Sequence, residues 1–140
     1  MLVLIVVLVN GTSKKGKTFP FFQFCVVFIR TDAPAAQSHI KAIATNVTDT
    51  QLGTTITNAH GVSVSTVEHV LAALYGMGID NAYIEIDGPE VPILDGSSSP
   101  FIDMIRAVGV RTLAAPRRTI EILEVIEVRA GQKFARLEPY

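Results

Sequence analysis

The sequence contains one cysteine, little net charge and no hydrophobic run long enough to cross a membrane. With no second cysteine, Cys25 cannot form an internal disulfide, so the chain suits a reducing compartment, and Cys25 is expected to be a buried apolar residue. A net charge of −1 argues against the basic face that nucleic-acid-binding proteins present, and the one concentrated basic run, Lys14–Lys17, is expected to be a solvated loop. We therefore expect no nucleic-acid partner.

The N-terminal apolar run, Leu2–Val9, has eight residues, whereas a membrane-spanning helix needs about 20. It also lacks the positively charged segment and the evident cleavage site of a signal peptide. We interpret it as a buried strand and expect the chain not to be transmembrane. A competing interpretation is a peripheral membrane or interaction protein that uses Leu2–Val9 and Phe19–Phe24 as an apolar surface, although neither run has the helical moment of an interfacial helix.

Apolar residues make up 49% of the 140 residues, which is enough for one hydrophobic core. Strands are predicted from runs rich in valine, isoleucine and phenylalanine, bounded by turn residues, at Leu2–Val9, Phe24–Arg30, Ile40–Ala44, Thr54–Thr57 and Ala82–Asp87. One helix is predicted from an apolar stripe that stops near Gly76 and Gly78: Val67, Val70, Leu71, Leu74 and Met77. A second is predicted at Pro100–Val108, with Phe101, Met104, Ile105 and Val108 on one side. These elements predict an α+β fold, a two-layer α/β sandwich in which a sheet packs on a helix pair.

The character of the chain changes near residues 114–118. Beyond that point two strands are predicted, Thr119–Val128 and Lys133–Leu137, joined by a short loop at Arg129–Gln132 that contains glycine. We divide the chain into a domain at residues 1–115, whose first 24 residues are atypical, and a hairpin at residues 116–140. Cut off from a larger sheet, such a hairpin is expected to pair poorly or to leave an exposed edge.

The most informative motif is Ser65-Thr66-Val67-Glu68-His69, at the predicted start of the first helix. A helix N-terminus favours an ionised Glu68 and a neutral His69, and neutral imidazole is the form that binds a metal. A general base and a metal ligand could therefore be neighbours. The same spacing also fits a capping box, in which Ser65 and Glu68 satisfy each other's backbone N–H groups.

The remaining candidate residues have simpler interpretations. Asp95 is a tempting catalytic acid, but an Asp-Gly turn followed by serine is a local structural device, and we interpret it as one. His39 and His60 are interpreted as surface or loop residues.

The run from Val62 to Phe101, reading VSVSTVEHVLAALYGMGIDNAYIEIDGPEVPILDGSSSPF, resembles the UDP-3-O-acyl-N-acetylglucosamine deacetylases, the zinc amidases of lipid A synthesis. The likeness extends more weakly to Phe28–Asp32, Asp49–Thr55 and Phe134–Tyr140. It implies a bacterial, cytoplasmic hydrolase, and a fold that resembles one half of the family's two-domain structure, with the hairpin beginning the second domain.

The resemblance also implies roles for single residues. Glu68 would be the general base and His69 a Zn²⁺ ligand, for removal of the N-acetyl group from UDP-3-O-(3-hydroxyacyl)-N-acetylglucosamine. In this family the other two ligands, a His and an Asp four residues apart, come from a later domain, so this chain alone is expected to be inactive and to need that domain. Gly53 stands where many relatives carry a cysteine near the metal. The alternative is a non-catalytic fragment or binding module in which Glu68 is only a helix cap.

Overall fold

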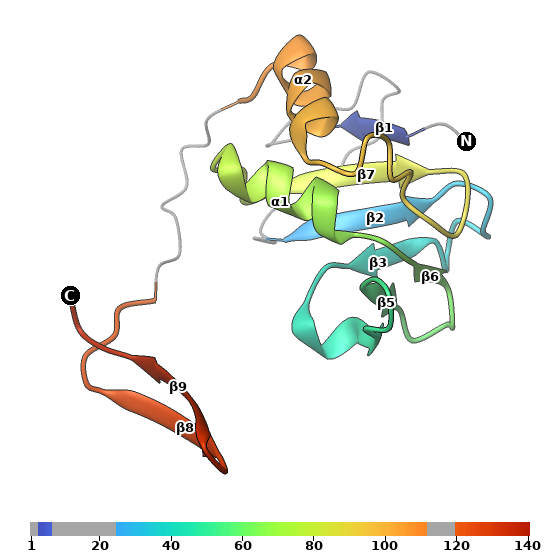
Figure 1. Ribbon diagram of the computed structural model, residues 1–140. Helices are drawn as coiled ribbons and strands as arrows, with labels where there is room; N and C mark the ends of the chain where they lie inside the picture. Colours follow the sequence, from blue (N-terminus) through green and yellow to red (C-terminus); the bar gives the residue numbers. More distant parts are fainter. Residues whose placement is uncertain (1–2, 7–24, 112–119) are drawn as a thin grey trace.

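A computed structural model describes residues 3–6, 25–111 and 120–140 of the chain (Figure 1). The runs Lys14–Lys17 and Phe19–Phe24, on which two of the predictions above rest, lie outside the described residues. Within the described ranges, no helix is both long and apolar enough to cross a membrane.

The main sheet has four strands in the order β1-β7-β2-β3. They are β1 (Val3–Val6), β7 (Ala82–Ile86), β2 (Val26–Arg30) and β3 (His39–Lys41). β2 and β7 run parallel, and the two outer pairings are antiparallel. Because parallel neighbours need a long crossover, the segment between β2 and β7 has room for further elements, which include the first helix. A predicted strand corresponds to each of the four, although Leu2 and residues 7–9 of the first lie outside the described residues.

A second, smaller sheet lies within that crossover and has the order β4-β5-β6. Its strands are β4 (Val47–Asp49), β5 (Thr55–Thr57) and β6 (Ser63–Val64), preceded by the 3-10 turn η1 (Ala44–Asn46). Only β5 was predicted from the sequence. The predicted strand Ile40–Ala44 is wrong at its end, because the chain enters η1, where the Asn46 side chain donates to the carbonyl of Lys41 at 2.9 Å.

Two helices, α1 (Glu68–Gly76) and α2 (Ser99–Val108), cover one side of the main sheet (Figure 1). The burial of β7 agrees with this arrangement. Its residues alternate between buried and half-buried, the period-2 pattern of a strand with one face on a core. The α+β sandwich is confirmed. The core side chains that are completely buried come from both layers and include Phe28, Ile84, Ile86, Val70, Phe101 and Ile105.

The stripe predicted for α1 is confirmed, since Val67, Val70 and Leu74 are buried. The stripe predicted for α2 is wrong in part. Phe101 and Ile105 are fully buried, but Met104 is 37% exposed and Val108 is 65% exposed. Met104 lies at the margin of the buried stripe and Val108 is the last residue of the helix, so spacing alone overestimated the width of the contact face.

The C-terminal hairpin consists of β8 (Ile126–Ala130) and β9 (Lys133–Leu137). Ala130 pairs with Lys133, so the turn is only Gly131-Gln132, and Gly131 has the positive φ of 62° that such a turn requires. The predicted strand Thr119–Val128 is therefore wrong at both ends: residues 120–125 have no strand partner in the described chain, and pairing continues to Ala130. Every hairpin residue is exposed, as expected for a strand pair without a larger sheet. The predicted boundary at residues 115 and 116 lies outside the described residues.

Cys25, which precedes β2, differs from the prediction. It is half-buried, and its thiol donates to the carbonyl of Val26 at 3.2 Å. Burial raises the pKa of this thiol, so it is a poor nucleophile.

Candidate active site

Three segments that are distant in sequence meet at the N-terminal end of α1. The first is the loop between β4 and β5, which contains Gly53 and Thr54. The second is the segment that leads from β6 into α1, and the third is the loop that follows β7. The last two are joined at Ser65, whose N–H donates to the carbonyl of Pro89 at 2.9 Å and whose carbonyl accepts from the N–H of Val91 at 3.0 Å.

Glu68 is the first residue of α1, and its two carboxylate oxygens have different surroundings. Oε1 accepts a short hydrogen bond of 2.6 Å from the backbone N–H of Thr54. Oε2 is buried and has no partner among the described residues. The Thr54 bond therefore fixes the orientation of the carboxylate and leaves one oxygen available.

His69, the next residue, also has a buried atom without a partner. Its ring nitrogen Nδ1 and Oε2 of Glu68 are the two buried side-chain polar atoms that lack a hydrogen bond in the described part of the chain. Each such atom costs about 1–3 kcal/mol of desolvation, so native structures rarely retain them without a functional reason. Two on consecutive residues indicate a site that a ligand completes.

The predicted capping box is wrong. The residue that precedes α1 is Val67, and no side chain caps the helix. Ser65 instead exchanges a hydrogen bond of 2.9 Å with the hydroxyl of Thr55. The reason is Thr66, whose φ of 57° turns the backbone away from the path that a capping box needs, so that Glu68 starts the helix instead of occupying its third position.

Backbone strain is concentrated around this site. Among the described residues other than glycine, three have positive φ: Leu52 at 59°, Thr66 at 57° and Leu94 at 53°. Leu52 precedes the Gly53-Thr54 step, Thr66 lies two residues before Glu68, and Leu94 precedes Asp95. A β-branched residue such as Thr66 is a clear outlier in this region, and such conformations gather at functional sites.

Asp95 forms the turn that its sequence predicts. One oxygen, Oδ1, accepts from both the N–H and the hydroxyl of Ser97, each at 2.9 Å. These hydrogen bonds lower the pKa of Asp95, and an electrostatic interaction with His69 contributes in the same direction. No sequence pattern indicates that this turn lies within electrostatic reach of His69, because the two residues are 26 positions apart.

Gly53 lies directly against the carboxylate. A β-carbon built on it would be 3.4 Å from Oε1 of Glu68 and 3.5 Å from the hydroxyl of Thr66. The resemblance drew attention to this position. The role of Thr54 was missed, because a backbone N–H that binds a side chain leaves no signature in the sequence.

The other predicted residues lie outside the site. His39 and His60 are exposed, as predicted. The described residues contain no group of three or more His, Cys, Asp or Glu side chains that could hold a metal by themselves.

Comparison with known proteins confirms the family resemblance that was drawn from the sequence. A family model described as UDP-3-O-acyl N-acetylglycosamine deacetylase matches residues 17–140. The chain belongs to this family. Curated relatives named UDP-3-O-acyl-N-acetylglucosamine deacetylase include one from Phenylobacterium zucineum that is 50% identical over 114 residues, covering 81% of this chain and 39% of the relative. Another, from Pseudoalteromonas atlantica, is 50% identical over 115 residues, covering 82% of this chain and 38% of the relative.

A third deacetylase, from Shewanella piezotolerans, is 46% identical over 116 residues, covering 82% of this chain and 37% of the relative. The chain thus spans about two fifths of the length of the deacetylases that it matches.

Proposed function

We propose that this chain supplies the general base, Glu68, and one zinc ligand, His69, of a bacterial, cytoplasmic deacetylase of lipid A biosynthesis. The substrate is UDP-3-O-(3-hydroxyacyl)-N-acetylglucosamine, from which the enzyme removes the N-acetyl group. The observation that carries the proposal is the pair of consecutive buried atoms without partners, Oε2 of Glu68 and Nδ1 of His69.

The residues fit a zinc site in part. His69 provides an imidazole in a half-buried position, next to a carboxylate. A catalytic zinc usually has three protein ligands and one open position, and the described residues do not supply three. The remaining ligands, a His and an Asp by family resemblance, would come from the part of the longer relatives that this chain does not cover. When bound, zinc supplies a water of lowered pKa and polarises the acetamide carbonyl.

Glu68 is arranged to move the proton. Because Oε1 is anchored on the N–H of Thr54, Oε2 keeps a fixed direction and can take the proton of the attacking water. Glu68 then returns that proton to the amide nitrogen as the C–N bond breaks. The products are acetate and a free amine on the glucosamine.

The test replaces the matching segment of the Phenylobacterium zucineum deacetylase with the segment from this chain, and measures acetate release and bound zinc. Glu68→Gln is expected to lower kcat by about 100-fold or more while zinc content is unchanged, since it removes the base and keeps the shape. His69→Ala is expected to lose zinc. His60→Ala, at an exposed histidine, is the control. A Glu68→Gln protein with undiminished kcat, or a His69→Ala protein with full zinc, contradicts the proposal.

The alternative of a non-catalytic module with Glu68 as a cap is weakened by the absence of any side-chain cap on α1. The carboxylate does form a structural bond to Thr54, but through one oxygen only.

A further inference from the structure

We propose that Glu90 is a positioning residue that holds Thr66 in its left-handed conformation and thereby sets the direction of the Glu68 carboxylate. The inference rests on the proposed function only in giving Glu68 the role of base. Glu90 lies in the loop that follows β7, 22 positions after Glu68, and is exposed.

The first step is the strain at Thr66. A left-handed conformation is unfavourable for a residue with a β-carbon, and only surrounding interactions keep it populated. At Thr66 the side chain provides one: its hydroxyl donates to Oε1 of Glu90 at 2.8 Å. A carboxylate acceptor makes this bond stronger than one between neutral groups.

The second step is the support for Glu90 itself. The backbone on both sides of it is fixed, since Pro89 and Val91 form hydrogen bonds with the two sides of Ser65. Glu90 therefore approaches Thr66 from a backbone that is already paired with the residue before Thr66. The loop after β7 and the entry to α1 therefore hold each other in place, and we call these residues, 65–66 and 89–91, the clamp.

The third step connects the clamp to the carboxylate. Immediately after the turn at Thr66, the N–H of Val67 donates to the carbonyl of Thr54 at 3.4 Å, and the N–H of Thr54 donates to Glu68 at 2.6 Å. Both bonds join the loop before β5 to the start of α1. The loop accepts in the first bond and donates in the second. If Thr66 returned to an ordinary backbone conformation, Val67 and Glu68 would change direction together, and the short bond to Thr54 would be lost.

The test is NMR spectroscopy of the 140-residue chain without zinc or substrate. The readouts are the chemical shift and the hydrogen exchange rate of the Thr54 amide, which report the bond to Glu68. In Glu90→Ala we expect the Thr54 amide to exchange about 10-fold faster and its resonance to move, because one hydrogen bond is weakened. The amides of Phe28 and Ile84, in the main sheet, should keep their wild-type rates.

Matched variants separate positioning from general stability. Glu90→Gln keeps an oxygen acceptor and is expected to restore most of the Thr54 protection, whereas Glu121→Ala removes an exposed carboxylate elsewhere and should change nothing. Thr66→Val removes the donor but keeps the branched shape, so it should reproduce Glu90→Ala, and it serves as the second variant if Glu90→Ala is unstable. Wild-type Thr54 behaviour in both Glu90→Ala and Thr66→Val overturns the proposal, as does a Glu90→Gln protein that behaves like Glu90→Ala.

The result is independent of the deacetylase assay. If Glu68→Gln left deacetylation intact, the proposed function would fail while the Thr54 readout could still succeed. In the deacetylase that carries this segment, Glu90→Ala is expected to lower kcat about 10-fold with KM unchanged, because misdirection of a base affects the chemical step more than substrate binding. An unchanged kcat there overturns the positioning role.

Discussion

At the start of α1, the surroundings of single residues depend on backbone atoms and backbone angles, which sequence patterns do not reveal. The motif drew attention to Glu68 and His69, whose roles remain a prediction, but the capping box inferred from the same residues was wrong. Whether Ser65 can cap depends on the backbone angles of Thr66, and a threonine in the left-handed region is the exception that propensities do not anticipate. One Glu68 oxygen is held by a backbone N–H that is 14 positions away in the sequence, and the other has no partner among the described residues.

Alanine substitutions at two glycines, Gly53 and Gly61, form a matched pair of predictions about backbone angle. Gly53→Ala should change the free energy of unfolding by less than about 0.5 kcal/mol, because its β-carbon meets only ordinary contacts at 3.4 Å or more. Gly61→Ala should destabilise the chain by about 1 kcal/mol, since Gly61 has open space around it but a φ of +77°. Urea denaturation measures both. Equal losses would contradict the explanation by backbone angle.

Asp95 makes a prediction about pH. Its pKa in the folded chain is lowered, so its contribution to stability is fully present above the unfolded pKa of about 3.9 and is lost as the pH falls through the lower folded pKa. In Asp95→Asn, which keeps the oxygen that accepts from Ser97, the decline of stability in acid should be shallower. Thermal unfolding from pH 7 to pH 2 measures it. An unchanged slope would mean that the folded chain does not lower this pKa.

At the scale of elements, sequence periodicity predicted the helices and strands that pack one face on the core. It did not predict the short strands that depend on pairing with a neighbouring strand. The alternation in β7 and the stripe in α1 are direct consequences of burial, so both were predicted correctly. β4 and β6 are three and two residues long and exist only because β5 lies between them. Residues 120–125 have strand-like composition but no partner in the described chain. Composition cannot reveal either fact.

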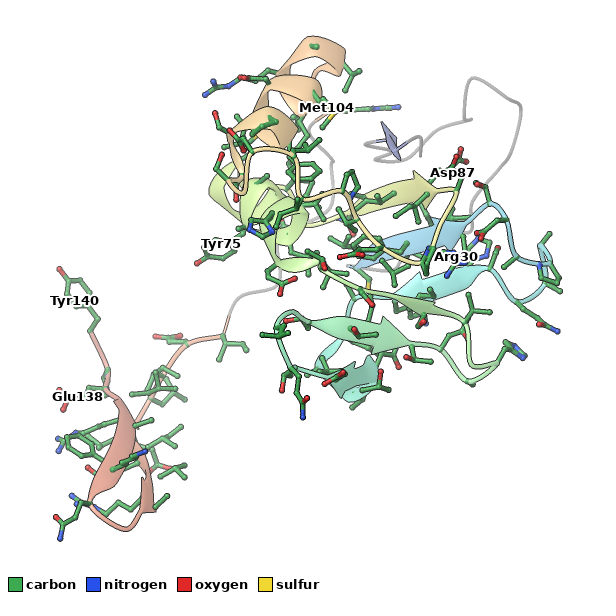
Figure 2. All side chains as sticks on the ribbon, turned by 45° about the vertical axis from the view of Figure 1, so that its right-hand side comes forward. Arg30, Tyr75, Asp87, Met104, Glu138 and Tyr140 are labelled. Carbon is green, nitrogen blue, oxygen red and sulfur yellow. The ribbon has the colours of Figure 1, made fainter. Side chains whose placement is uncertain are left out.

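α1 provides a direct test of the two-layer packing. Leu74 is 1% exposed in the core, whereas Tyr75, the next residue, is 89% exposed and projects into solvent (Figure 2). Leu74→Ala should lower the free energy of unfolding by about 2–5 kcal/mol through the lost apolar contacts and the remaining cavity. Tyr75→Ala should change it by no more than about 0.5 kcal/mol. Similar losses for the two variants would contradict the placement of α1 on the sheet.

At the scale of the whole molecule, the sandwich and the hairpin differ in how much they bury. The sandwich has one continuous core, whereas Phe134, Val128 and Leu137 in the hairpin are each more than half exposed. The C-terminal residues Glu138 and Tyr140 lie with the hairpin, away from the helices (Figure 2). The predicted change of character near residues 114–118 falls outside the described residues. The division into two domains remains a prediction.

The difference in burial predicts that the sandwich does not depend on the hairpin. A chain that ends at residue 115 should unfold at the same urea concentration as the 140-residue chain, because the hairpin residues are exposed and isolated two-stranded hairpins are marginally stable. In the longer chain, the amides of β8 and β9 should exchange with solvent much faster than those of β2 and β7. A large drop in the midpoint on truncation would show that the hairpin packs on the sandwich in solution.

The parallel pairing of β2 with β7 has a consequence for the order of folding. Val26 pairs with Ala82 and Arg30 with Ile86, so each pair joins residues 56 positions apart. Closing so long a loop is entropically costly, and chains dominated by distant pairings fold slowly. Thr54, Thr66 and Glu68 all lie inside that loop. Ser65 and Thr66 also bond to residues that directly follow β7. We therefore expect recovery of the Thr54 amide signal during refolding to be as slow as recovery of the sheet itself.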